Sequence, residues 1–102
     1  MVLVPTHRAP TSPGEMLLEE FLEPMGITQS EFAERIGVTF QRVNAIVNGR
    51  RGITADTALR FARFFGTSPG FWMNLQTMTD LFEAQRAAGK EIEKIEPAAR
   101  SA

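Results

Sequence analysis

The sequence of 102 residues contains no cysteine, no tyrosine and a single histidine. Without cysteine the chain cannot form disulfides or thiolate metal sites, and one histidine cannot supply a paired-imidazole site, so we expect no metal and no other cofactor. Without these residue types the chain has almost no side chains that could act as a catalytic nucleophile paired with a base. We therefore expect no catalytic residue and no enzyme activity. Long apolar runs are also missing: none approaches the roughly 18 residues that span a bilayer, and the N-terminal MVLV is too short for a signal-peptide core. We expect a cytoplasmic protein that has no contact with membranes.

The composition supports one small globular domain, because 43% of the residues are hydrophobic and 23% are charged. The net charge of −1 conceals an uneven distribution along the chain. Residues 28–65 carry six arginines against three acidic residues, whereas residues 1–27 carry Arg8 against four glutamates. A positive segment attached to an acidic one indicates two different partners, one of them polyanionic, although neutralisation within the fold explains the acidic part equally well.

Residues 29–48, QSEFAERIGVTFQRVNAIVN, predict two short helices joined by a tight turn. Gly37 can end the first helix in a left-handed conformation, and Thr39 can cap the second. Two short helices joined in this way form the helix-turn-helix pattern. The apolar positions give each helix its own buried side: Phe32, Ala33 and Ile36 in the first, and Val43, Ile46 and Val47 in the second.

The outer side of the second helix is polar but uncharged, with Gln41, Asn44, Ala45 and Asn48 at helical spacing. Glutamine and asparagine can each donate and accept, which suits the adenine edge in the major groove of DNA, and alanine allows a close approach or contact with a thymine methyl group. Amides also solvate ordinary exposed helices. Because these residues lie on the second helix of a helix-turn-helix, we predict that all four read bases.

Cationic and hydroxyl side chains flank this helix. Two arginines sit in the loop 49–52, Gly-Arg-Arg-Gly, where the glycines free the backbone. A solvated basic loop is one interpretation, and a clamp on DNA phosphates is the other. We predict phosphate contacts for Thr39, Arg42, Arg50 and Arg51.

Capping signals predict five helices and no strands in a domain over residues 12–88, between a flexible tail at 1–11 and a charged tail at 89–102. The first helix begins with a capping box at Ser12-Pro13-Gly14-Glu15, and Thr28 with Glu31 forms a second box. The expected core comprises Leu17, Phe21, Phe32, Ala33, Ile36, Val43, Ile46, Phe61, Ala62, Phe65, Phe71 and Leu75.

Two further surfaces are expected to bind proteins. On the first helix, Glu19, Glu20 and Glu23 lie mostly on the solvent-exposed side and form an acidic face, which suits a basic partner. Four large apolar residues lie off the core stripes of the last two helices, and large exposed apolar side chains mark contact surfaces. We predict that they form a homodimer interface: Phe64, Trp72, Met73 and Leu81.

Three segments, PGEMLLEEFLEPMGIT, VNGRRGITADTALRFARFFGTSPGFWMNLQ and the following Asp80-Leu81, resemble the HigA antitoxin family, also called virulence-associated protein I, over about residues 12 to 83. The helix-turn-helix alone indicates only the lambda-repressor-like superfamily. The chain departs from the family pattern at Ser12, where histidine is usual, and at Phe40, where a polar residue or proline is usual.

The resemblance implies an all-α, five-helix lambda-repressor-like domain that binds double-stranded operator DNA as a homodimer. It also implies a type II toxin–antitoxin module, in which the protein represses its own operon and neutralises a small basic ribonuclease toxin. The acidic face is then the expected toxin-binding surface. Stand-alone helix-turn-helix repressors without a toxin share nearly the same pattern, and they form the alternative.

Overall fold

The computed structural model describes residues 8–99, which contain helices and no strand. The first helical segment is continuous and comprises α1 (Pro13–Glu15), the π-helical stretch η1 (Met16–Leu22) and α2 (Glu23–Met25). Four helices follow it: α3 (Gln29–Ile36), α4 (Phe40–Val47), α5 (Ala55–Phe65) and α6 (Pro69–Glu93). Within the described residues, the prediction of an all-α fold with five helical segments is therefore confirmed. Residues 1–7 and 100–102 of the two predicted tails lie outside this range.

Side-chain caps begin the helices at the predicted residues. The hydroxyl of Ser12 accepts the backbone N–H of Glu15 at 3.1 Å, and the carboxylate of Glu15 accepts that of Ser12 at 3.2 Å, which confirms the first capping box. At Thr28 only half of the second box forms. Its hydroxyl accepts from Glu31 at 3.0 Å, while the Glu31 carboxylate lies 3.7 Å from the Arg35 guanidinium.

The first helical segment continues through Pro24 and ends at Gly26. Pro24 has no N–H to donate, and the wider π-helical turns of η1 end two residues before it. Gly26 has φ 66°, a left-handed conformation that glycine adopts without strain. The segment therefore ends where the sequence predicts.

Phe32 lies at the centre of an aromatic core. It is fully buried, and its ring centroid lies 5.2 Å from those of Phe61, Phe64 and Phe65. Such ring pairs stabilise a core by about 0.5 to 1.5 kcal/mol each beyond the area that they bury. The predicted core residues that are buried are Leu17, Phe32, Ala33, Ile36, Val43, Ile46, Phe61 and Ala62.

The buried side of the last helix differs from the predicted one at Trp72. It was expected outside the core, yet it is 0% exposed and packs against Phe21, Phe61 and Phe71. Its indole N–H donates to the hydroxyl of Thr67 at 2.8 Å, so burial leaves no polar group unpaired. Because Trp72 takes the inward position, Phe71 on the neighbouring side of α6 is only half-buried, as are three other predicted core residues: Phe21, Phe65 and Leu75.

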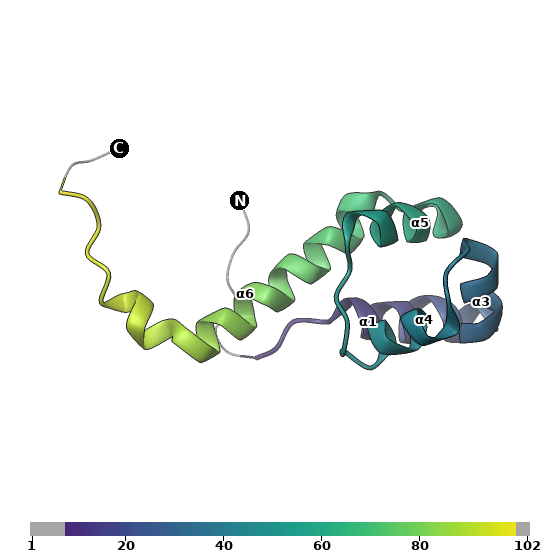
Figure 1. Ribbon diagram of the computed structural model, residues 1–102, viewed down its shortest axis with the longest axis horizontal. Helices are drawn as coiled ribbons and strands as arrows, with labels where there is room; N and C mark the ends of the chain where they lie inside the picture. The colour runs from purple at the N-terminus through teal and green to yellow at the C-terminus, as the bar shows by residue number, and fades with distance from the viewer. Residues whose placement is uncertain (1–7, 100–102) are drawn as a thin grey trace.

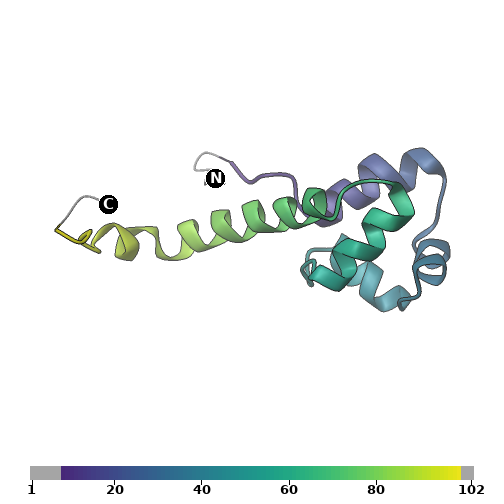
Figure 2. The same ribbon diagram turned by 90° about the horizontal axis from the view of Figure 1, so that it is seen from above.

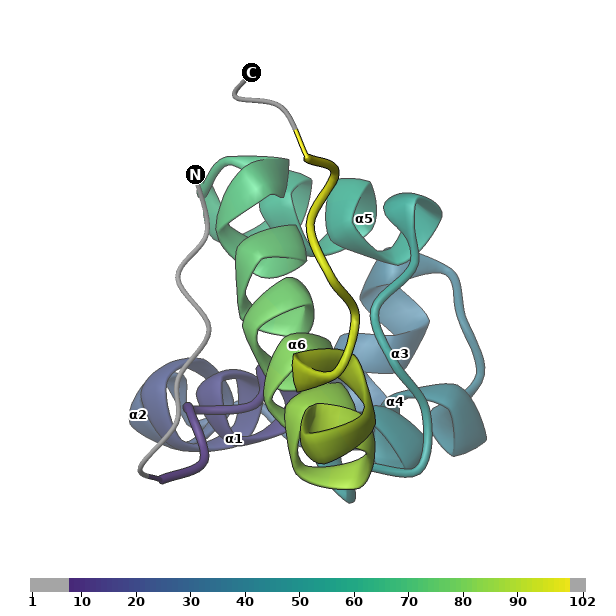
Figure 3. The same cartoon turned by 90° about the vertical axis from the view of Figure 1, so that its left-hand side faces the viewer.

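The helix α6 projects far beyond the other helices (Figures 1 and 2), and the molecule measures 54 × 24 × 21 Å. Seen from the C-terminal end, the first helical segment lies on one side of α6, and α3, α4 and α5 lie on the other (Figure 3). The helix continues past residue 88, the expected end of the domain, to Glu93 in the expected charged tail. Alanine, lysine and glutamate are strong helix formers, which favours this extension. No helix in residues 8–99 is both long and apolar enough to cross a membrane.

Candidate nucleic-acid interface

The helix-turn-helix is formed by α3, the turn at residues 37–39 and α4. Gly37 has φ 76° and ends α3, and the backbone N–H of Val38 donates to the carbonyl of Ala33 at 3.0 Å. The hydroxyl of Thr39 then accepts the N–H of Arg42 at 3.1 Å and begins α4. The turn chemistry expected at Gly37 and Thr39 is therefore confirmed.

The outer side of α4 carries the four predicted base-reading residues. Val43 and Ile46 are buried beneath this helix, which turns the remaining positions outward. Gln41 and Asn48 are exposed, and Asn44 and Ala45 are half-buried.

Asn44 is the centre of a hydrogen-bond network on this surface. Its amide nitrogen donates to the side-chain oxygen of Gln29, at the start of α3, at 3.2 Å. Its amide oxygen accepts from Asn48 at 3.1 Å and from the Arg50 guanidinium at 3.2 Å. Gln41 stands outside this network. Asn44 therefore joins α3, the end of α4 and the arginine loop, a role that the spacing of α4 alone does not reveal.

The arginine loop, residues 49–52, is fixed at both ends. The backbone N–H groups of Arg50 and Arg51 both donate to the carbonyl of Ala45, at 2.8 and 3.2 Å. At the other end, the side-chain oxygen of Gln76 in α6 accepts the N–H of Ile53 at 2.7 Å. Both arginine side chains are exposed. The loop thus presents two cations from a constrained backbone beside the end of α4, and Gln76 is a positioning residue that sequence reasoning missed.

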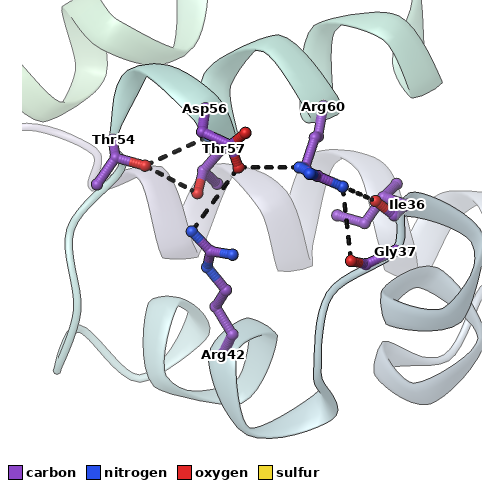
Figure 4. Close-up of polar contacts among 7 residues, drawn as sticks. All are labelled: Ile36, Gly37, Arg42, Thr54, Asp56, Thr57 and Arg60. Atoms are coloured by element: carbon purple, nitrogen blue, oxygen red, sulfur yellow. Dashed lines mark hydrogen bonds and ion pairs between the residues drawn. The ribbon is translucent and has the colours of Figure 1, made fainter.

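Arg42, another of the predicted phosphate-binding residues, points from α4 toward α5 (Figure 4). One of its guanidinium nitrogens lies 3.8 Å from the carboxylate of Asp56 in α5, and its Nε is buried without a hydrogen-bond partner in the described structure. The same carboxylate accepts from Nε of Arg60 at 2.9 Å. Arg60 in turn donates to the carbonyl of Ile36 at 2.7 Å, so three helices meet in this clasp (Figure 4).

The clasp of Arg42, Asp56 and Arg60 explains how the turn is held. The carbonyl of Ile36 lies at the end of α3, where carbonyls lack partners within the helix, and a guanidinium satisfies it. Asp56 in the first turn of α5 also suits the positive end of that helix. The sequence places Arg42 among the cations beside α4, and the structure shows that an acidic residue on another helix sets the direction of its side chain.

The first helical segment packs closely against the end of α4. Gly14 is buried, and a Cβ atom added there would overlap the carbonyl oxygen of Ile46 and lie 2.7 Å from that of Val47. Real Cβ atoms do not approach backbone so closely, so only glycine fits. Gly14 therefore fixes the distance between the first segment and the C-terminal end of α4.

The residues expected to bind proteins divide by exposure. Glu19, Glu20 and Glu23 are all exposed, as an acidic face requires. No group of three or more His, Cys, Asp or Glu side chains in residues 8–99 is placed to hold a metal ion.

Of the predicted dimer residues, Trp72 is buried in the core and cannot contact a partner, which corrects that prediction. The others are half-buried: Phe64, Met73 and Leu81.

These elements define a helix-turn-helix domain of the lambda-repressor-like fold, in which α4 occupies the position of a recognition helix. The sequence matches the helix-turn-helix family model over residues 18–72. It is 49% identical over 74 residues to virulence-associated protein I of Dichelobacter nodosus, which covers 72% of this chain and 68% of that protein. It is 41% identical over 92 residues to antitoxin HigA-1 of Vibrio cholerae serotype O1, covering 90% of this chain and 87% of that protein.

A solved structure agrees with these relatives. The Pseudomonas aeruginosa antitoxin HigA with the higBA promoter superimposes with a TM-score of 0.84 at 46% identity, covering 87% of this chain and 98% of that chain. Both the length and the fold of the two chains therefore correspond. The chain belongs to the HigA antitoxin family.

Proposed function

We propose that this chain is a sequence-specific DNA-binding antitoxin that binds double-stranded operator DNA, represses its own operon and neutralises a ribonuclease toxin. The observation that carries the DNA-binding part is the joint placement of the amide-bearing side of α4 and the arginine loop. Gln41 is exposed near the start of α4, and Arg50 and Arg51 follow its end, bound through their backbone to Ala45. An α-helix fits the major groove, so one element can present base-reading groups while its flank meets the phosphates.

The base-reading residues differ in how many of their hydrogen-bonding groups are already used within the chain. Gln41 stands outside the Asn44 network, so its amide can pair with an adenine edge through both its donor and its acceptor. Asn44 accepts twice and donates once within the chain, which leaves one N–H for a base. Ala45 and Asn48 complete the surface. Asn44 therefore contributes mainly by orienting Asn48 and the Arg50 side chain.

The phosphate contacts come from Thr39, Arg50 and Arg51. Arg50 and Arg51 are exposed cations, and the hydroxyl of Thr39 keeps its own hydrogen as a donor while it caps α4. Arg42 belongs to the clasp and takes no part in this set. Contacts of this kind fix the register of a protein on DNA without reading its sequence.

The protein acts in the cytoplasm as a homodimer. Two recognition helices about 34 Å apart are needed to enter successive major grooves on one side of the duplex. Phe64, Met73 and Leu81 retain partly exposed apolar surface that a second copy can cover. The acidic face on the first helical segment contacts the toxin, because glutamates complement a basic ribonuclease and speed its encounter.

The test is a titration of duplex DNA from upstream of the coding sequence, with a shuffled duplex of equal length and composition as the control. We expect tight binding to the upstream duplex and weaker, salt-sensitive binding to the shuffled one. Equal affinity for both would contradict sequence-specific repression.

Co-expression with the adjacent open reading frame separates the antitoxin from a stand-alone repressor. A neighbour that arrests growth alone, and is tolerated when this chain is present, supports the antitoxin function. If the upstream duplex is bound and no neighbour is toxic, the stand-alone repressor is correct instead.

A further inference from the structure

A groove between α3 and α5 takes no part in the DNA-binding surface. Its volume is about 360 Å³, and Leu59 on its wall is 59% exposed. Phe64 lies beside it, with the Arg35 guanidinium 4.7 Å above its ring centroid. Leu59 and the partly exposed ring of Phe64 give the groove an apolar wall that a partner can cover. We call this feature the α3–α5 groove.

The rim of the α3–α5 groove is basic. Three arginines and one aspartate line it, and Asp56 is already engaged by Arg42 and Arg60. Arg35 lies 3.7 Å from Glu31, whereas Arg63 forms no ion pair with any described residue. The groove therefore suits an occupant that combines apolar side chains with negative charge.

The end of α6 and the three residues that follow it have this composition. Residues 91–96, Glu-Ile-Glu-Lys-Ile-Glu, contain three glutamates and one lysine. Ile92 in the last turn of α6 is 48% exposed, and Ile95, which follows the helix, is 69% exposed. The backbone N–H of Ile95 donates to the carbonyl of Ile92 at 3.0 Å, which holds the two residues in one turn. This segment extends beyond the packed helices (Figures 1 and 2), and all six of its residues are exposed.

The segment cannot fill the groove of its own chain. The α3–α5 groove lies at one end of a molecule 54 Å long, and residues 91–96 lie at the other end (Figure 1). A straight helix of 25 residues spans about 37 Å, so α6 carries the segment away from its own domain. The DNA backbone offers charge but no apolar group for Leu59, and a basic toxin is repelled by the arginines.

We propose that residues 91–96 of one copy dock into the α3–α5 groove of a second copy, and that the exchange is reciprocal in a two-fold dimer. Ile92 and Ile95 cover Leu59 and Phe64, and the flanking glutamates meet Arg35 and Arg63. A two-fold axis produces both contacts at once, since the same pair of surfaces meets twice. This inference rests on the proposed homodimer, and it specifies which segment of one copy contacts which groove of the other.

Introduced cysteines test the contact directly, because the chain has none of its own. The full-length chain with Leu59→Cys and Ile95→Cys is oxidised and run under non-reducing conditions. The control carries Leu59→Cys and Glu83→Cys, since Glu83 is exposed on α6 outside the segment. All three positions are exposed, so the variants keep the buried core, and circular dichroism checks this. We expect a covalent dimer that forms about tenfold faster for the first pair, in line with the effective concentration of a docked segment.

A charge reversal gives a second readout. Arg63→Glu should weaken the dimer by about tenfold in sedimentation, because like charges then face each other, and adding Glu93→Arg should restore it. If sedimentation shows a dimer but both cysteine pairs cross-link at the same rate, the docking of residues 91–96 is wrong and the homodimer stands. If the chain is monomeric at micromolar concentration, both proposals fail, while binding to upstream DNA is still judged by its own titration.

Discussion

Replacing Arg51 with alanine should weaken DNA binding through electrostatics alone. The side chain of Arg51 is exposed, and the bond that holds the loop comes from its backbone N–H to Ala45, which alanine keeps. Each phosphate contact contributes about 0.9 to the slope of log affinity against log salt, so two contacts in a dimer contribute about 1.8. Between about 50 and about 200 mM salt, the affinity of the variant should therefore fall about 12-fold less than that of the wild type.

Arg42→Ala is the matched control, because it removes the same charge from the neighbouring helix. Arg42 lies against Asp56, whose side chain is 57% exposed, so its loss should cost at most about 1 kcal/mol of stability and leave the salt slope unchanged. Fluorescence anisotropy with a labelled upstream duplex over a salt series measures both variants. A slope that flattens equally for Arg42→Ala and Arg51→Ala would refute the assignment of Arg42 to the clasp.

Three other predictions concern the scaffold and the acidic face. Gly14→Ala should destabilise the protein by about 1 to 3 kcal/mol or more in thermal unfolding, because its Cβ meets the backbone of α4, whereas Gly70→Ala, with its nearest neighbour at 3.9 Å, should be tolerated. An equal effect of the two would contradict the close packing at Gly14. Phe32→Ala should cost about 3 to 5 kcal/mol in denaturant unfolding, since Phe32 is fully buried, and a cost below about 1 kcal/mol would show that it is not the centre of the core. Replacing the three glutamates of the acidic face with lysine should slow association with the toxin at low salt, and an unchanged rate would remove that surface from consideration.

Features that depend on neighbouring residues were predictable from the sequence. The caps at Ser12 and Thr39 and the left-handed Gly37 follow from side chains within three residues of the helix ends. The apolar spacing of α3 and α4 likewise identified their buried sides. The fold class and the outer side of the recognition helix could therefore be predicted from local chemistry.

Contacts between distant residues could not be predicted in this way. The clasp depends on Arg60 reaching Ile36, 24 residues earlier, and the arginine loop is held by Gln76, 23 residues after Ile53. No spacing rule connects such positions. The phase of α6 depends on Thr67 accepting the indole N–H of Trp72, which makes full burial of that side chain possible. Helical periodicity alone placed Trp72 outside the buried side of α6, because it does not include the contact with Thr67.

In the proposed division of roles, the outer side of α4 reads bases while the arginine loop contacts the DNA backbone. A base-substitution scan of the upstream duplex, titrated with the wild-type protein and with Gln41→Ala, tests it most directly. We expect Gln41→Ala to lose its preference at one base pair in each half-site, at a cost of about 1 to 3 kcal/mol per pair, and to keep the wild-type salt slope. A variant that binds every duplex more weakly by the same factor, with no position relaxed, would contradict this division of roles.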